Sequence, residues 1–491
     1  MENISDLKSK AINGSLWSML EQFSMLFVQF IVGVILARLL SPGDYGLLAL
    51  TMVFSGVSAA ITDGGFEKSL IHKKDLSSVQ INTIFFINIV LGMVMVFVII
   101  LFAPMVAIFF NAPKLTMVLR IMSIGIIINA AGQTPSALLR KHLAFKKISY
   151  SHIFGSVLGG IVGIILAMSG SGVWALVIST LTSQLIMLLG YLYCSSWRPK
   201  LEFSYSSIKS MLSFGLTILF SSIVFFVIQQ FNNMAVGRYY NKTQLGLFHR
   251  GSRLPELITS VVEGVVLKMA FPVFSKVQDN NDQLSEVLKK TIQILAFITF
   301  PLMTILFSNA RDLTIILFTK KWEGSIIFLE FFCIVKLFYP FIIIYKEVLL
   351  VKGQAALSSK ILVGFSILEI ICVLAFISHG VIYVIISSLI MAVFQYLTYL
   401  WFFSKKINIS VIDQLGWIGK YVFAAFLVFL VTVITDKVLS FSQISLLLKL
   451  LIKLLAGVQV YILFAFVLKM KETVYIKNVT QFLTKGINAA L

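Results

Sequence analysis

Four ionisable residues inside one long apolar stretch, residues 246–279, could do chemistry in this chain. Arg250, Arg253, Glu256 and Glu263 follow one another at short intervals. At about 100° per residue, they and their polar neighbours fall within an arc of roughly 140° on one helix face. A charge at the centre of a membrane-spanning helix costs on the order of 3 kcal/mol and usually faces a bundle interior or a wet cavity. The stretch therefore predicts one wall of a polar cavity inside a membrane protein.

The two arginines are suited to binding phosphate, because a guanidinium presents a planar fork that matches phosphate oxygens. Arg250 and Arg253 lie three residues apart, on neighbouring positions of one helix face. We expect them to contact a diphosphate, with Glu256 beside them. In the alternative interpretation, Arg253 pairs with Glu256 and Arg250 extends its head group towards the membrane surface. Both interpretations hold if Arg253 exchanges Glu256 for the diphosphate during transport.

Other polar residues within apolar runs are weaker candidates. Lys336, six residues after Glu330, is either a second cationic cavity residue or one half of a helix–helix ion pair. Glu21 and Gln29 lie eight residues apart on one stripe. Gln29 is either a sugar contact or, as we favour, part of an interhelical hydrogen bond.

Charges near the ends of equivalent apolar runs suggest gates. Asp63 and Glu263 could each close an inner gate by pairing with a lysine, Lys68 or Lys268, or could be water-exposed end charges. Arg38 and Arg238 lie at the outer ends of equivalent runs. They could orient the chain or form an outer gate, and interfacial snorkelling is the default interpretation.

Two further sites have open interpretations. Glu369 is a lone carboxylate that could bind a proton or sodium, although an interhelical partner is favoured. Lys449 and Lys453, four residues apart, could meet anionic lipid headgroups or an isoprenoid diphosphate, or simply mark an outer helix end.

The composition is that of an integral membrane protein. Of 491 residues, 58% are hydrophobic and 12% charged, and the mean hydropathy is +0.96; soluble domains carry about 25% charged residues. The net charge of +19 does not indicate nucleic-acid binding, because the basic residues punctuate apolar runs and do not share one soluble face. The three cysteines and five histidines are scattered, which predicts neither a disulfide framework nor a metal site.

Apolar runs of bilayer length predict an all-α polytopic membrane protein with about fourteen transmembrane helices. They lie at about 14–38, 45–70, 81–110, 115–138, 150–169, 173–195, 210–235, 245–270, 288–310, 325–350, 356–378, 380–403, 417–435 and 443–468. Lys and Arg concentrate at the even-numbered junctions and the termini, which predicts that both termini are cytoplasmic. The first run shows no cleavage pattern and is expected to be an uncleaved span. The short junctions leave no room for a soluble domain.

The chain also repeats itself at an offset of 200 residues, which predicts duplication of a six-span unit. The matches are Gln29 with Gln229, Arg38 with Arg238, Gly46-Leu47 with Gly246-Leu247, Asp63-Gly64 with Glu263-Gly264, and Lys68 with Lys268. We expect a first lobe at 1–200, a second at 201–405, and two appended helices with a cytoplasmic tail at 406–491. Parallel repeats of this kind are typical of transporters that work by alternating access.

Several short motifs stand out along the chain: Leu39 to Gly46, Asp63 to Phe66, Phe109 to Pro113, Arg250 to Pro255, and Phe271 to Ser275 followed by Gln278-Asp279. Together they resemble the polysaccharide exporters (Wzx-type flippases) of the multidrug/oligosaccharidyl-lipid/polysaccharide (MOP) exporter superfamily. The likeness covers nearly the whole chain and is greatest to the subgroup that serves capsule, colanic-acid-like or O-antigen polymers. One departure is Phe248-His249-Arg250-Gly251, where the pattern Tyr-x-Arg-Ala is expected.

The resemblance implies a V-shaped pair of six-helix lobes around a central cavity. The implied substrate is an undecaprenyl-diphosphate-linked oligosaccharide, turned from the inner to the outer leaflet of the cytoplasmic (inner) membrane. The chain is then not an enzyme and has no prosthetic group, and its transport would couple to a H⁺ or Na⁺ gradient. Protein partners would come from the polysaccharide polymerase and chain-length machinery.

Two alternatives stay open on the sequence. A multidrug/cation antiporter of the same superfamily should carry more acidic than basic cavity residues, and here the basic ones at least match them. A membrane polysaccharide polymerase or ligase should carry a large periplasmic loop with clustered Arg or His, which the short junctions do not provide.

Overall fold

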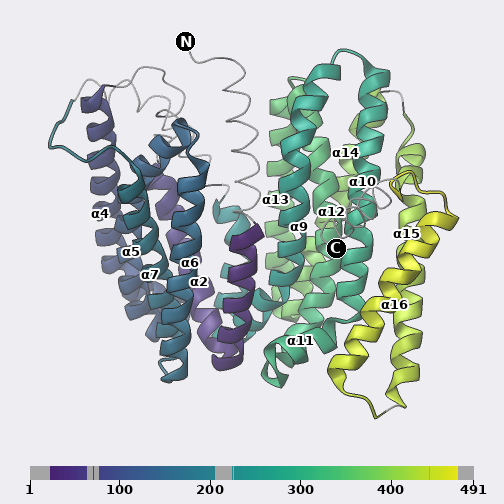
Figure 1. Ribbon diagram of the computed structural model, residues 1–491, viewed down its shortest axis with the longest axis horizontal. Helices are drawn as coiled ribbons and strands as arrows, with labels where there is room; N and C mark the ends of the chain where they lie inside the picture. The colour runs from purple at the N-terminus through teal and green to yellow at the C-terminus, as the bar shows by residue number, and fades with distance from the viewer. Residues whose placement is uncertain are drawn as a thin grey trace, which may run out of the picture. The chain divides into compact units, whose positions relative to one another are not determined.

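The computed structural model describes residues 23–63, 70, 77–204, 224, 226–407, 409–441 and 443–473. All secondary structure within these ranges is helical (Figure 1). In this part of the chain, eleven helices are long and apolar enough to cross a membrane, and a shorter apolar helix spans Phe23–Leu39. The all-α membrane fold is thereby confirmed, while the count of fourteen spans stays a prediction.

The chain divides into two compact units, residues 1–249 (the first unit) and 250–491 (the second unit). The division falls inside the long helix α9 (Lys242–Val277). The three-part division at residues 200 and 405 stays a prediction. Besides the helix Phe23–Leu39, the described part of the first unit includes α2 (Pro42–Asp63), α4 (Ser78–Phe109), α5 (Lys114–Lys141), α6 (Phe145–Met168) and α7 (Val173–Cys194).

Helices of the first unit approach one another closely at small residues. Gly155, Gly159 and Gly163 recur every four residues on α6, which places them on one face. A Cβ added to Gly159 would lie 1.9 Å from Ser183 Oγ of α7. The Ser179 hydroxyl donates to the Gly159 carbonyl at 2.8 Å. Small residues of this kind let helix backbones approach and hydrogen-bond within a membrane.

The 200-residue repeat has a physical counterpart inside the first unit. A Cβ on Gly46 of α2 would lie 1.7 Å from the Lys242 carbonyl oxygen, and a Cβ on Gly246 of α9 would lie 1.8 Å from the Pro42 carbonyl oxygen. These contacts are reciprocal, and the same offset of 200 relates both pairs. The two equivalent helix starts therefore cross at a point where only glycine fits.

The second unit contains the rest of α9 and the helices that follow it, with aromatic side chains in its core. Tyr345 and Tyr399 are fully buried and stack with ring centroids 6.5 Å apart. The Tyr345 hydroxyl donates to Gln414 Oε1 at 2.9 Å. The elements are α10 (Asn281–Ser308), α11 (Ala310–Phe318), η1 (Lys320–Ser325), α12 (Ile326–Val351), α13 (Ala355–Phe376), η2 (Ile377–His379), α14 (Val381–Ile407), α15 (Val411–Ser440) and α16 (Leu446–Val467).

Candidate functional site

Carboxylates in the interior of long helices belong to the second unit, among the residues that the structure describes. In the first unit, Asp44 lies in the first turn of α2, and Asp63 is the last residue of that helix. In the second unit, Glu256, Glu263 and Glu369 lie well inside α9 and α13. The candidate site is therefore built from this unit.

An ion pair joins α9 to α12. Lys336 Nζ lies 3.9 Å from Glu256 Oε1, and the two side chains are 18% and 38% exposed. The same ammonium lies 4.3 Å from the centre of the Tyr339 ring. This is the helix–helix pairing that the sequence left open for Lys336, and it gives Glu256 a partner other than Arg253.

Glu369 is held between two neighbouring helices. Its Oε1 accepts a hydrogen bond of 2.6 Å from the hydroxyl of Ser388 on α14. Ser388 is buried, and its hydroxyl also contacts the Val384 carbonyl at 3.3 Å. The structure thus gives Glu369 an interhelical partner.

The two arginines of α9 have different surroundings. The guanidinium carbon of Arg250 lies 3.9 Å from the ring centre of Phe318 and 5.7 Å from that of Trp322. Cation–π contacts of this kind fix an arginine against aromatic rings. Arg253, by contrast, is exposed. The predicted pair of phosphate ligands is therefore split, with Arg250 directed to α11 and η1.

Gly251 accounts for the departure from the family pattern next to Arg250. A Cβ at this position would lie 2.6 Å from Phe328 Cβ and 2.9 Å from the backbone nitrogen of Leu329. An alanine would force α9 away from α12. The glycine thus permits the close packing that brings Arg250 to the aromatic rings.

The structure describes only some of the remaining predicted residues. Gln29, the predicted sugar contact or hydrogen-bond partner, is exposed, as is the predicted gate residue Arg38. The Arg238 guanidinium carbon lies 4.9 Å from the ring centre of Phe109 within the first unit. Glu21 and Lys68 lie outside the described residues.

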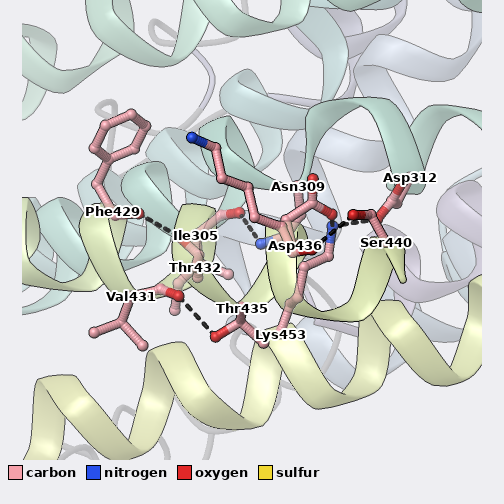
Figure 2. A network of polar contacts seen from close by, with 11 residues as sticks. Ile305, Asn309, Asp312, Phe429, Val431, Thr432, Thr435, Asp436, Ser440 and Lys453 are labelled. Carbon is pink, nitrogen blue, oxygen red and sulfur yellow. Dashed lines mark hydrogen bonds and ion pairs between the residues drawn. The ribbon is translucent and has the colours of Figure 1, made fainter. Parts of the chain in front are cut away.

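A charged triad that sequence reasoning did not find ties α16 to its neighbours (Figure 2). Lys453 is only 3% exposed, and its Nζ contacts Asp436 Oδ1 of α15 at 2.7 Å. It also pairs with Asp312 of α11. A buried, doubly paired ammonium does not meet lipid headgroups, so that hypothesis for Lys453 is wrong. The partners lie 17 and 141 residues away in sequence, beyond the reach of local spacing.

An apolar groove lies between α10, α12 and α15. Its volume is about 310 Å³. Aromatic and aliphatic side chains dominate its lining, among them Phe300, Phe307, Leu337, Phe426 and Phe429. Phe426 is also 54% exposed, so the groove opens at the unit's surface.

Comparisons with known sequences agree on one family. Residues 35–327 match the family described as "Polysaccharide biosynthesis protein". The chain is 25% identical over 306 residues to the succinoglycan biosynthesis transport protein ExoT of Rhizobium meliloti, covering 62% of each chain. It is 24% identical over 337 residues to the lipopolysaccharide biosynthesis protein WzxC of Escherichia coli, covering 67% of this chain and 68% of the relative. It is 24% identical to the teichuronic acid biosynthesis protein TuaB of Bacillus subtilis, covering 72% and 73%.

Solved structures share the fold at low sequence identity. The inward closed conformation of the lipid II flippase MurJ superposes with a TM-score of 0.70 at 17% identity, covering 95% of this chain and all of that one. The inward-facing conformation of a multidrug resistance MATE family transporter of the MOP superfamily gives 0.61 at 15% identity, covering 79% and 98%. The chain therefore shares the fold of these two solved structures.

Proposed function

This chain belongs to the polysaccharide biosynthesis protein family, and we propose that it is a flippase for undecaprenyl-diphosphate-linked oligosaccharides. In this proposal it turns repeat units of a surface polysaccharide across the cytoplasmic membrane by alternating access. Three relatives are named for the biosynthesis of succinoglycan, lipopolysaccharide and teichuronic acid, and the first of these is named a transport protein.

One observation carries the diphosphate part of the proposal: α9 and α12 both present cationic groups. Arg253 is exposed on α9, and Lys336 forms a 3.9 Å ion pair with Glu256. At that length the ammonium can exchange a carboxylate for a phosphate oxygen. Arginine supplies the planar fork that a diphosphate recognises.

The apolar groove supports the lipid part of the proposal. Its lining of Phe, Leu, Ile and Met side chains suits a hydrocarbon chain, and its 310 Å³ would hold part of an isoprenoid tail. The groove and the pair between Glu256 and Lys336 both involve α12. One helix would therefore contact the tail and the head group of the same lipid.

Orientation and energy source complete the proposal. In this proposal both termini lie in the cytoplasm, because Lys and Arg concentrate at the termini and the even-numbered junctions. Loops rich in these residues are retained on the cytoplasmic side of the membrane. Coupling to a H⁺ or Na⁺ gradient would use Glu263 or Glu369, which are carboxylates inside helices of the second unit. Partner proteins would be the polymerase and the chain-length machinery that receive the flipped unit.

The test is a fluorescence-quench assay on vesicles that hold the purified protein and a labelled undecaprenyl-diphosphate-linked oligosaccharide. We expect Arg253→Glu to abolish flipping while the protein remains folded, because the carboxylate repels the diphosphate. The matched control is Arg311→Glu, since Arg311 is 70% exposed and pairs with Glu323 at 3.1 Å on the surface of the same unit. We expect this control to flip at the wild-type rate.

Two results would contradict the proposal. Wild-type vesicles that flip no faster than protein-free vesicles would rule out the flippase. Undiminished flipping by Arg253→Glu would rule out this arginine as a diphosphate contact.

A further inference from the structure

The first unit contains an uncharged polar cavity that the proposed handling of the diphosphate does not use. It lies between α2, α5 and α7 and has a volume of about 20 Å³. Its polar lining comes from Ser55, Thr62, Asn129 and Gln184. Gln133 adjoins it, donating from its amide nitrogen to Thr62 Oγ1 at 3.4 Å.

Two buried amide oxygens at this cavity accept no hydrogen bond within the described protein. They are Oε1 of Gln133 and Oε1 of Gln184. Buried polar atoms in proteins almost always have a partner. One unsatisfied acceptor in the lining, Gln184 Oε1, and a second on the adjoining Gln133 therefore point to a ligand or water that donates hydrogen bonds.

The chemistry of the lining limits what that ligand can be. None of the described residues that line the cavity is charged, so these residues offer a phosphate no cation and offer a cation no carboxylate. Amide and hydroxyl groups both donate and accept hydrogen bonds, as sugar hydroxyls do. A cavity of 20 Å³ holds a group the size of one hydroxyl or one water molecule.

The cavity is reachable from its rim. Ala59 and Asn129, which lie on α2 and α5, are exposed, whereas Thr62 is fully buried. An entering group would pass Asn129 and meet the Gln184 amide. The site thus has one amide at its exposed rim, an amide acceptor in its lining, and Gln133 adjoining it through Thr62.

We propose that this cluster is a glycan-recognition subsite, in which Gln184 and Gln133 accept hydrogen bonds from a hydroxyl of the lipid-linked sugar. The inference rests on the proposed flippase function. It assigns sugar recognition to neutral side chains of the first unit. The diphosphate stays with the charged residues of the second.

Two glycines of α5 allow a matched steric test. A Cβ on Gly125 would lie 2.3 Å from Gln184 Oε1, so Gly125→Ala displaces that amide from the cavity. A Cβ on Gly132 would meet only the Tyr191 ring at 3.6 Å and the Leu188 side chain at 3.9 Å, which are ordinary contacts. Gly132→Ala makes the same substitution on the same helix and leaves the cavity unchanged.

The experiment measures flipping of two probes that carry the same fluorophore, in vesicles that hold wild-type or variant protein. One probe is an undecaprenyl-diphosphate-linked oligosaccharide, and the other is undecaprenyl diphosphate without sugar. We expect Gly125→Ala and Gln184→Leu to slow the glycan-bearing probe roughly three- to tenfold, as for one or two lost hydrogen bonds. The sugar-free probe should change less than about twofold, and Gly132→Ala should flip both probes at the wild-type rates.

Other outcomes overturn the inference. Equal slowing of both probes would mean that the cluster only supports the fold, and unchanged flipping of the glycan probe would remove the subsite. An effect of Gly132→Ala equal to that of Gly125→Ala would do the same. If wild-type protein flips neither probe, the proposed function itself fails, which is a separate result from any variant-specific loss.

Discussion

The two units hold their helices together by different means. In the first, glycine and serine bring backbones into contact, as between Gly159 of α6 and Ser179 of α7, where a hydroxyl reaches a backbone carbonyl at 2.8 Å. In the second, large rings and ion pairs fill the spaces between helices, as where Tyr345 lies beside Tyr396 and Tyr399. The buried ion pair between Lys453 and Asp312 also lies inside the second unit.

The difference lies in what each kind of helix contact requires. Where Gly46 and Gly246 cross inside the first unit, no side chain fits, so the residue type is fixed. Between the helices of the second unit, side chains fill the space, so aromatic rings and an ion pair can lie there.

The largest expected effect is in the charged unit. Lys453→Met leaves Asp312 buried without its ammonium, and loss of one partner from a buried ion pair costs about 3–5 kcal/mol of unfolding free energy. Thermal and denaturant unfolding in detergent would measure it. The control is Lys449→Met, one turn earlier on α16, with an expected change within about 0.5 kcal/mol.

A second variant shows whether that cost comes from the stranded carboxylate. Adding Asp312→Leu to Lys453→Met should recover most of the loss, because an apolar replacement of a whole ion pair is often neutral. A Lys453→Met protein as stable as the wild type would contradict the view that charge pairing holds α16 in place.

A smaller effect is expected where the first unit depends on close approach. Gly159→Ala places a Cβ 1.9 Å from Ser183 Oγ and 2.7 Å from the Ser179 carbonyl oxygen, which should cost roughly 1–3 kcal/mol. Gly364→Ala on α13 of the second unit meets nothing within 4 Å and should stabilise its helix by about 0.5–1 kcal/mol. The unfolding free energies of both variants, measured in detergent, compare the two units directly. Equal changes in the two variants would contradict the proposed difference in how the units hold their helices together.

The smallest effect concerns a single hydrogen bond in the aromatic core. Tyr345→Phe removes the donor to Gln414 Oε1, which is buried, and should cost about 1 kcal/mol. Tyr383→Phe is the control, because Tyr383 is 42% exposed. If the two variants unfold alike, the core of the second unit depends on packing alone and not on this bond.

Some of this arrangement could be predicted from sequence because it repeats or is local. Hydropathy predicts the membrane-spanning helices, and the 200-residue offset pairs Gly46 with Gly246, which approach each other in the structure. The pairing of Lys336 with a residue of another helix is one of the two interpretations that the sequence allows. These predictions depend on residue type and on regular spacing along the sequence.

The rest depends on partners that are distant in sequence. The spacing of Arg250 to Arg253 predicts a phosphate contact. The rings that Arg250 contacts, however, belong to Phe318 of α11 and Trp322 of η1, which are distant in sequence. Lys453 pairs with Asp312 across 141 residues. A helical pattern shows which residues share a face but not which element covers that face, so neither contact had a local signal.

The central claim is that charged residues of the second unit recognise the diphosphate. The most direct measurement compares flipping of one oligosaccharide on an undecaprenyl diphosphate and on an undecaprenyl monophosphate carrier, in wild-type and Lys336→Gln vesicles. Wild-type protein should prefer the diphosphate carrier, and Lys336→Gln should reduce that preference roughly tenfold, as for the loss of one charge-assisted hydrogen bond. A wild-type preference that Lys336→Gln leaves intact would contradict the account.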